Sequence, residues 1–382
     1  MKVPLGFEVA GVVAGVKRSG RHDLGLLYSS APLAWAYAAT TNKVAAPCVV
    51  RDRALAATGA PVRALVVTSG NANCANGARG EQDDLRLASA AAAALGLAGP
   101  DEVLSASTGV IGQPMPIDKL VAGLPQAAAA RGDDSEAFSK AILTTDLVTK
   151  VAEAEVAGGA RVVGVAKGSG MIHPNMATMF AFVMTDAAID QAELRAMWTR
   201  VVDRTFNQLT VDGDTSTNDM AVVLSSGRLA ADQTELEAAL EAVTASLAKK
   251  IARDGEGATK LITVRVTGAR DDVEARRAAR TVAGSSLVKT AVHGSDPNWG
   301  RILAALGRAD VELDEAKVRV AAQGFELYSG EPQPFDAKEV SAALRAEDVL
   351  IEADLGVGAA RGEAWGCDLS EGYVRINADY TT

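Results

Sequence analysis

Residues 167–179 read KGSGMIHPNMATM and lie near the middle of a chain of 382 residues. Apolar runs flank this stretch on both sides, at 161–166 and 180–184. Both runs are partly β-branched and too short for an independent helix, so they predict two short buried strands. Between them the chain has glycines that permit close backbone approach, a proline that fixes a turn, and Thr178 after a small alanine. The pattern therefore predicts a tight loop that carries a hydroxyl residue.

Thr178 acquires a base of its own if the Ala177–Thr178 peptide bond is cut. A hydroxyl on an ordinary strand is a poor nucleophile. After scission Thr178 carries a free α-amine, whose unperturbed pKa is about 7.7–8.0, and this amine can accept the proton of Oγ. The residues alone thus allow a self-activating nucleophile at position 178.

The central stretch closely resembles the self-cleavage segment of the ornithine acetyltransferase family, the bifunctional glutamate N-acetyltransferases of arginine biosynthesis. The resemblance covers nearly the whole chain. Other matching stretches follow one another in order, at 6–7 with 10–12, 69–73, 107–112, 144–146, 212–219, 254–260, 296–301 and 377–382. Each of them is weak evidence alone, but their order along one chain is specific.

The resemblance implies self-cleavage between Ala177 and Thr178 and an αββα sandwich. Residues 1–177 are expected to become an α chain, and residues 178–382 a β chain that begins with the nucleophile. Strands and helices of mixed order predict layered α/β packing independently of the resemblance. Because no long linker, repeat or low-complexity segment divides the sequence, we expect one packed body. The family suggests an assembly of two α and two β chains.

Residues 102–112 predict a strand that ends in a glycine-punctuated turn. Thr108 and Gly109 need be nothing more than that turn. A glycine amide beside a hydroxyl is also a compact pair of donors for a developing oxyanion. The residues leave both interpretations open, whereas the resemblance favours the second, because the matching Thr-Gly pair forms the oxyanion hole in the family.

The resemblance also implies a set of substrate contacts, namely Thr144, Lys167, Thr178, Glu256, Asn377 and Thr382. By itself, Thr144 is equally typical of a helix-end hydrogen bond, and Glu256, between two glycines, is typical of a solvated turn. In the expected site Glu256 attracts the side-chain amine of ornithine. Lys167 either pairs with a substrate carboxylate or favours the neutral amine of Thr178 through its charge.

Other candidate sites are weaker. Residues 212–214 look like an acidic calcium loop but lack the glutamate at the loop's end, so a polar loop beside the site is the better hypothesis. The three cysteines are far apart and lack metal-ligand spacing. Structural roles are expected for His173 and His293, because a cleaved amino-terminal threonine brings its own base. We therefore expect no metal and no cofactor.

The composition limits the partners. A net charge of −10 argues against a general nucleic-acid binder, which needs a concentrated basic face. The first residues lack a long apolar secretory segment, and no stretch approaches the roughly 20 apolar residues that span a bilayer. We expect a cytoplasmic globular protein with neither nucleic-acid nor membrane partners.

These expectations combine into one activity. The enzyme moves the acetyl group of N2-acetyl-L-ornithine to L-glutamate through an acetyl-threonine intermediate, with ping-pong kinetics. Acetyl-CoA as a second donor would make it bifunctional, and no residue decides this. Two alternatives remain: an amidase or aminopeptidase of the same nucleophile class, and a non-catalytic small-molecule binding protein, which would have no reason to be cut at residue 177.

Local patterns predict several elements outside the central stretch. Amphipathic periodicity indicates helices beginning at Asp190 and over about 234–253. Residues 6–50 are expected to form strands and hairpins, Asp83 to cap the helix that follows it, and the tail from Tyr373 to begin as a strand.

Overall fold

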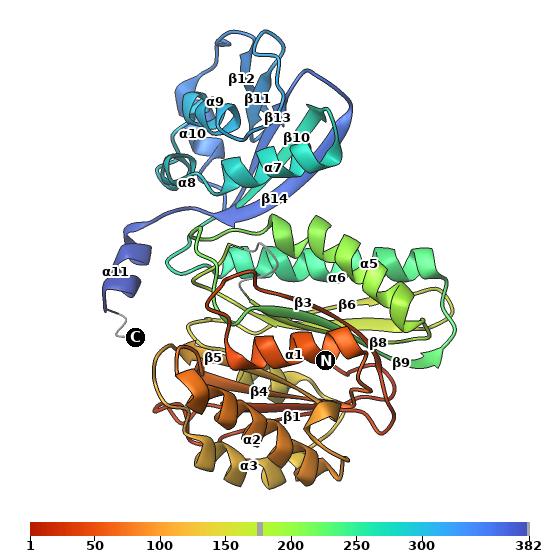
Figure 1. The fold of residues 1–382 in the computed structure, drawn as a ribbon. Coiled ribbons are helices and arrows are strands. Elements are labelled where there is room, and N and C mark those ends of the chain that lie inside the picture. Colours follow the sequence, from red (N-terminus) through yellow and green to blue (C-terminus); the bar gives the residue numbers. More distant parts are fainter. Residues whose placement is uncertain (174–178, 380–382) are drawn as a thin grey trace.

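The computed structural model describes residues 1–173 and 179–379. Three predicted site residues, Ala177, Thr178 and Thr382, lie outside the described residues. The rest of the chain forms three sheets, two of which stack in a layered body while the third forms a smaller C-terminal unit (Figure 1).

The first sheet has the strand order β1-β2-β4-β5. Its strands are β1 (Glu8–Val12), β2 (Leu24–Tyr28), β4 (Ala64–Asn71) and β5 (Val103–Val110). The last two are parallel, so their carboxyl ends meet at one edge, where Gly70 lies opposite Gly109. Helices α2 (Gly77–Leu95) and α3 (Ile117–Ala129) cover the outer face of this sheet (Figure 1).

The second sheet contains the two strands predicted around the central stretch. Its order is β3-β9-β8-β7-β6, with β3 (Ala34–Ala39), β9 (Met220–Leu229), β8 (Phe180–Ala187), β7 (Arg161–Lys167) and β6 (Lys150–Glu155). Lys167 pairs with Phe180 across β7 and β8. Helices α5 (Gln191–Arg204) and α6 (Gln233–Arg253) cover the outer face. Strands from before and after residue 177 thus share one sheet.

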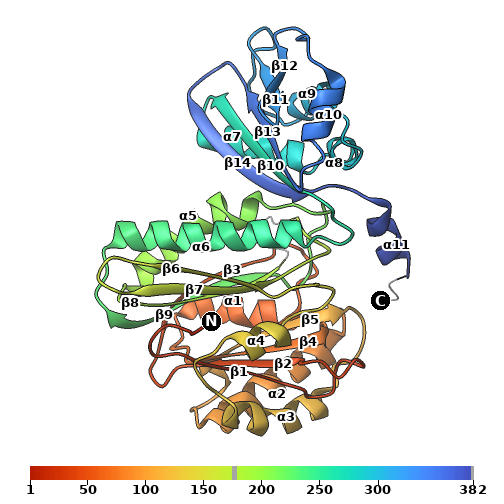
Figure 2. The same ribbon diagram turned by 180° about the vertical axis from the view of Figure 1, so that it is seen from behind.

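The two sheets pack through a common apolar core. It unites residues of both inner faces with α1 (Pro47–Thr58) and α4 (Glu136–Ala141), which lie between the sheets (Figure 2). Phe138 of α4 meets Phe182 of β8 edge-on at 5.8 Å. The body is thus the layered α/β sandwich that was predicted, with two sheets between outer helices, and the short helices α1 and α4 are added between the sheets.

The C-terminal unit has a sheet and a core of its own. Its sheet order is β12-β11-β13-β10-β14, formed by β10 (Leu261–Ala269), β11 (Arg319–Ala322), β12 (Phe325–Ser329), β13 (Asp348–Asp354) and β14 (Ala360–Cys367). Its helices are α7 (Asp272–Ala283), α8 (Ser286–His293), α9 (Trp299–Gly307) and α10 (Ala337–Ala343). The chain then leaves the unit and returns along the layered body as α11 (Glu371–Asp379) (Figures 1 and 2).

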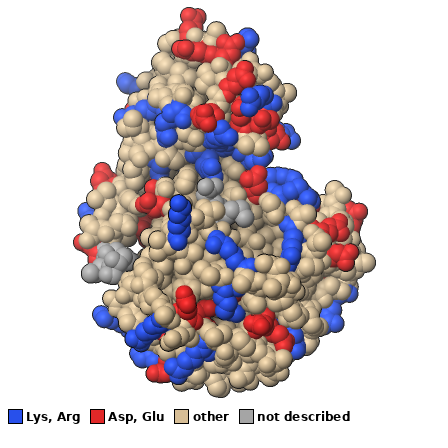
Figure 3. Space-filling view, viewed as in Figure 1, with Lys and Arg blue, Asp and Glu red and all other residues tan. Residues whose placement is uncertain are grey.

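Charged side chains of both signs are intermixed on the face seen in Figure 3, most densely on the C-terminal unit. Two 3-10 turns, Pro100–Glu102 and Phe206–Gln208, complete the elements. In the described part of the chain, no helix has both the length and the apolar character needed to cross a membrane.

Three local predictions were wrong. The strand prediction for residues 6–50 holds to Ala39, after which α1 begins at Pro47, a residue well suited to the first helical position. Asp83 is no cap, because α2 already begins at Gly77; its buried carboxylate lies 3.6 Å from Arg79 instead. The tail from Tyr373 is helical. It pairs with none of the strands formed by residues 1–173 and 179–379, so its backbone groups bond within the segment despite its β-branched residues.

Candidate active site

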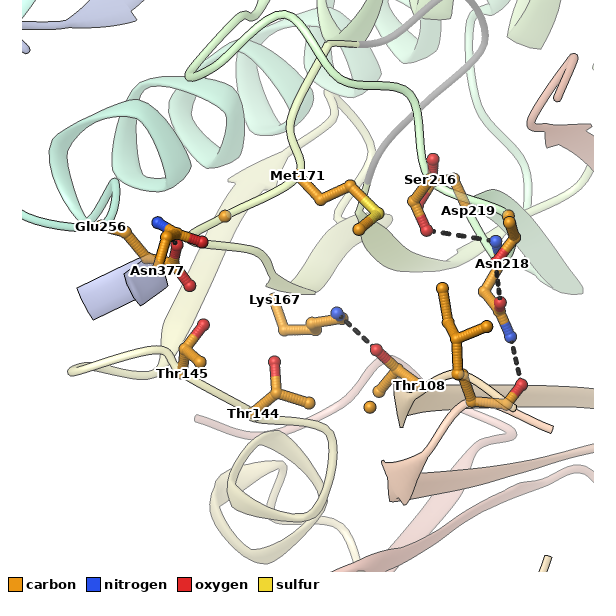
Figure 4. Close-up of a pocket in the computed structure, with 15 residues that line it drawn as sticks. Thr108, Thr144, Thr145, Lys167, Met171, Ser216, Asn218, Asp219, Glu256 and Asn377 are labelled. Carbon is orange, nitrogen blue, oxygen red and sulfur yellow. Dashed lines mark hydrogen bonds between the residues drawn. The ribbon is translucent and has the colours of Figure 1, made fainter. Parts of the chain in front are cut away.

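A pocket of about 150 Å³ lies between the two stacked sheets, at the edge where β4, β5 and β7 end (Figure 4). The first sheet contributes the carboxyl ends of β4 and β5. The second contributes the end of β7 and the loop before β9. The lining residues are Ala72, Thr108, Gly109, Ile111, Thr144, Thr145, Lys167, Gly170, Met171, Ser216, Thr217, Asn218, Asp219, Glu256 and Asn377.

Six residues singled out from the sequence line this one pocket: Thr108, Gly109, Thr144, Lys167, Glu256 and Asn377. They come from five separate places in the chain. Thr178 stands two positions before Phe180, the first residue of β8, and Phe180 pairs with Lys167. The pocket therefore lies at the strand ends nearest to the central stretch.

Lys167 occupies the centre of the pocket in Figure 4. Its Nζ donates a hydrogen bond of 2.7 Å to Oγ1 of Thr108 and lies 5.1 Å from the centre of the Phe180 ring. Burial lowers the pKa of Lys167, and the nearby carboxylates of Asp146 and Asp219 offset this only in part. The ammonium group thus approaches the oxygen of the predicted oxyanion donor.

Gly109 is required by the close approach of two strands. Its φ is +133°, a conformation that residues with a side chain rarely adopt. A Cβ atom at this position would overlap the carbonyl carbon of Gly70 on β4. Thr108 and Gly109 thus lie within β5, so the turn interpretation of this pair was wrong, because pairing with β4 extends the strand to Val110. The donor interpretation stays a prediction.

Glu256 and Asn377 form the opposite side of the pocket. Nδ2 of Asn377 donates to Oε2 of Glu256 at 3.0 Å, across 121 residues of sequence. The backbone N–H of Glu256 donates to the carbonyl of Ser169 at 3.0 Å. Gly170 packs directly on the carboxylate, since a Cβ there would overlap Glu256. A carboxylate held in this way is suited to a cationic ligand group.

Asp212 in the polar loop and Met220 at the start of β9 hold the two sides of the central stretch. Asp212 accepts hydrogen bonds from the backbone N–H groups of Met171 at 2.6 Å and Ile172 at 2.8 Å. Beyond the stretch, the carbonyl of Met179 accepts from the N–H of Met220 at 3.0 Å. The carboxylate of Asp212 therefore positions the backbone of the central stretch. Within residues 1–173 and 179–379, no group of three or more ligating side chains is placed to hold a metal ion.

Comparison with known proteins identifies the family. The model of the ArgJ family matches residues 8–382. This chain belongs to the ArgJ family. The "Arginine biosynthesis bifunctional protein ArgJ" of Thermus thermophilus is 58% identical over the full length of both chains, and the relative of the same name in Deinococcus radiodurans is 51% identical over 99% of this chain and 97% of its own.

A solved structure agrees with this assignment. It is a Bacillus halodurans protein titled arginine biosynthesis bifunctional protein argJ, with 46% identity and a TM-score of 0.52. All of that chain is matched, yet it spans only 53% of this one. Membership of the family confirms the resemblance found in the sequence.

Asn218 is a pocket residue that sequence reasoning missed. Its Nδ2 donates to the carbonyls of Ala72 at 2.6 Å and Ser107 at 2.7 Å, so one amide ties the loop before β9 to the ends of β4 and β5. Its Oδ1 accepts from the Thr217 hydroxyl at 2.6 Å. In the sequence, Asn218 stood out only as part of the family match at 212–219. Its residue type did not indicate a role, because asparagine is common in polar loops.

A buried ionic network lies behind the pocket. Lys150 bonds Asp146 at 2.7 Å and Asp254 at 2.5 Å, and all three side chains are almost fully buried. Asp146 also accepts from the N–H of Thr144 at 3.0 Å and of Gly168 at 2.6 Å. Burial raises the pKa of Asp146, but Lys150 and Lys167 outweigh it, so the pKa lies below its ordinary value. The network thus positions two backbone segments of the pocket.

The histidines have other partners. Nδ1 of His173 lies 3.0 Å from the Thr210 hydroxyl, and Nδ1 of His293 lies 2.7 Å from Oδ2 of Asp368. Neither residue lines the pocket.

Proposed function

We propose that this chain cuts itself between Ala177 and Thr178 and then transfers the acetyl group of N2-acetyl-L-ornithine to L-glutamate. Acetyl transfer in arginine biosynthesis is the activity of its family, to which the chain belongs over residues 8–382. The observation that carries the detailed proposal is the pocket, where Thr108, Lys167 and Glu256 converge at the strand ends that flank the central stretch.

Self-cleavage begins when Oγ of Thr178 attacks the carbonyl carbon of Ala177. The C–N bond breaks, the Thr178 nitrogen takes the proton, and an ester joins the two residues. Water then hydrolyses the ester to give a carboxyl group on Ala177 and a free amine on Thr178. The hydrogen bonds at Met171, Ile172 and Met179 fix both approaches to this bond.

Two observations support this step. A solved relative that is matched along its whole length spans 53% of this chain, close to the share of residues 178–382. β8 also lies between β7 and β9, so the pieces before and after the cut remain in one sheet.

Acetyl transfer uses the new amine as the base. The amine takes the Oγ proton while Oγ attacks the acetyl carbonyl of N-acetylornithine. The Thr108 hydroxyl and the Gly109 N–H would hold the oxyanion, a contribution of about 3–4 kcal/mol per good donor. The C–N bond then breaks, ornithine leaves with the proton on its α-amine, and an acetyl ester remains on Thr178. The α-amine of glutamate then attacks the ester carbonyl and loses a proton, the C–O bond to Oγ breaks, Oγ regains a proton through the Thr178 amine, and N-acetylglutamate leaves.

The pocket supports the assignment of substrate contacts. Glu256 is placed to bind the side-chain ammonium of ornithine, with Asn377 fixing its carboxylate. Thr144 lies on the wall nearest to Lys167 in Figure 4. Lys167 lends its charge to Thr108 and to an incoming carboxylate. Thr178 and Thr382 complete the proposed set.

The remaining partners are part of the same proposal. Acetyl-CoA is a second acetyl donor, which accords with the word bifunctional in the names of the relatives. Two α and two β chains assemble into the active enzyme, which works in the cytoplasm without a metal or other cofactor.

The test is an assay of acetyl transfer from N-acetylornithine to glutamate, together with mass spectrometry of the purified protein. We expect two fragments, 1–177 and 178–382, and glutamate-dependent release of ornithine. Thr178→Ala should abolish both cleavage and activity. Release of acetate without glutamate would favour an amidase, and an active protein that remains uncut at residue 178 would contradict the mechanism.

A further inference from the structure

The loop between β1 and β2 carries a run of cations with no acidic partners. Residues 17–22 read KRSGRH, and Arg18 and Arg21 are exposed. Among the described residues, no carboxylate forms an ion pair with Lys17, Arg18 or Arg21, whereas Arg200 and Arg204 of α5 are paired with Glu237 and Glu241. The overall charge of −10 gives no hint of this loop.

Hydrogen bonds to one buried carboxylate hold the backbone of this loop in place. The buried carboxylate of Asp23 accepts hydrogen bonds from the backbone N–H groups of Ala14 at 2.6 Å, Val16 at 2.6 Å and Lys17 at 3.0 Å. These bonds hold the backbone of the loop on Asp23, whose charge also acts on Lys17, while Arg18 and Arg21 extend to the solvent. The N–H of Gly20 closes a turn on the carbonyl of Lys17 at 3.2 Å.

The loop also lies beside the active site. A Cβ atom at Gly70 would lie 3.2 Å from Cγ of Lys17, and Gly70 is the residue that packs against Gly109, one of the two proposed oxyanion donors on β5. Asp146 and Lys167 are both near enough to influence the charge of Lys17. Cations therefore extend from the end of β5 outward to the solvent.

We propose that the loop at residues 17–22 binds the phosphate groups of a coenzyme A thioester, the second acetyl donor of this enzyme. The inference rests on the proposed function. In such a donor a long, uncharged pantetheine arm separates the thioester from the phosphates, so its phosphate site must lie outside a pocket of about 150 Å³. Planar guanidinium groups, as on Arg18 and Arg21, suit phosphate oxygens.

The chemistry at Thr178 is unchanged by this donor. Oγ attacks the thioester carbonyl, the C–S bond breaks, and the thiol leaves with the proton held by the α-amine. The product is the same acetyl-threonine ester, and its acetyl group is then transferred to glutamate as before. The loop thus distinguishes donors by their phosphates, and N-acetylornithine, which has none, makes no use of it.

The experiment compares the wild-type enzyme with the double variant Arg18→Ala/Arg21→Ala. Arg319→Ala/Arg345→Ala is the matched control, since it removes two exposed arginines of the C-terminal unit that likewise form no ion pair among the described residues. Each enzyme is assayed with acetyl-CoA, with S-acetylpantetheine, which lacks phosphates, and with N-acetylornithine. Binding of coenzyme A is measured by calorimetry.

We expect the loop variant to raise KM for acetyl-CoA at least tenfold and to lose calorimetric binding of coenzyme A. Its kinetics with S-acetylpantetheine and N-acetylornithine should match those of the wild-type enzyme. An equal loss with all three donors would overturn the inference, because the loop would then support the common chemistry or the fold and not the binding of phosphate. A wild-type enzyme that transfers acetyl from N-acetylornithine but neither uses acetyl-CoA nor binds coenzyme A would also overturn it, leaving the proposed function intact.

Discussion

Lys167 donates a hydrogen bond of 2.7 Å to the hydroxyl oxygen of Thr108, a residue 59 positions earlier in the chain. An ammonium group can only donate, so the Thr108 oxygen is the acceptor and its own hydrogen must be given elsewhere. The pocket is where a substrate oxyanion would receive it. Lys167 is therefore a positioning residue for the oxyanion donor as well as a charge near the substrate.

This relationship predicts that Lys167→Met acts through Thr108. A hydrogen bond to a charged group is worth about 1.5–3 kcal/mol, which corresponds to a loss in kcat of roughly ten- to hundredfold. The double variant with Thr108→Val should then be no slower than Thr108→Val alone, because the two residues act as a unit. Steady-state kinetics of the three variants measure this, after mass spectrometry has shown that each is cut.

Additive losses in the double variant would show that Lys167 works independently of Thr108. In that case its role is the binding of the substrate carboxylate, and the variant should change KM more than kcat.

Gly170→Ala is expected to weaken the binding of N-acetylornithine. The new Cβ atom would overlap the carboxylate of Glu256, which is the mobile end of a side chain and moves aside. The melting temperature should therefore stay the same, whereas KM for N-acetylornithine should rise about tenfold, the value of one charge-assisted hydrogen bond. KM for glutamate, which has no side-chain amine, should not rise.

Gly307→Ala is the matched control, because a Cβ atom there would meet no neighbour within 4 Å. Glu256→Gln should reproduce the effect of Gly170→Ala on N-acetylornithine. If neither substitution changes that KM, Glu256 does not bind the ornithine amine.

Lys150→Met is expected to destabilise the protein strongly. It leaves the buried carboxylates of Asp146 and Asp254 without their common cation, which costs about 3–5 kcal/mol of unfolding free energy. Lys140→Met, which removes an exposed ion pair with Glu136, should cost less than about 1 kcal/mol. Urea unfolding of the uncut Thr178→Ala protein measures both, because no second fragment dissociates.

Similar losses for the two lysine variants would mean that water reaches the network around Lys150. The pH dependence gives a second check. Since the pKa of Asp146 is lowered in the folded protein, its contribution to stability is present above pH 3.8 and is lost as the pH falls through the lowered value.

The titration of Lys17 is expected to make KM depend on pH for acetyl-CoA but not for N-acetylornithine. Burial lowers its pKa to about 8, so its charge is present at neutral pH and disappears as the pH rises through that value. KM for acetyl-CoA should therefore rise between pH 7 and pH 9.5 relative to KM for N-acetylornithine. In Lys17→Arg the charge persists over this range, and the rise should vanish.

The ratio of the two KM values cancels the titration of the Thr178 amine, which both donors need. A ratio that changes equally in the wild-type enzyme and in Lys17→Arg would exclude Lys17 as the group responsible.

The sequence by itself determined the elements that depend on neighbours along the chain. The apolar runs at 161–166 and 180–184 predicted β7 and β8, and amphipathic periodicity predicted the start of α5 and both ends of α6 to within a residue. The order of motifs identified the family and named six residues of one pocket. Prediction was wrong where the local signal conflicted with the surroundings, as in α11, whose β-branched residues have no strand beside them.

Only the tertiary structure decided how these residues meet. The bond from Lys167 to Thr108, the bond from Asn377 to Glu256 and the packing of Lys17 on Gly70 all join residues far apart in the sequence. The physical reason is that hydrophobic periodicity and turn residues encode backbone conformation over a few positions, whereas contacts between distant residues follow from how sheets and helices pack. The buried charges of Asp146, Lys150 and Asp254 are stable only because that packing brings them together.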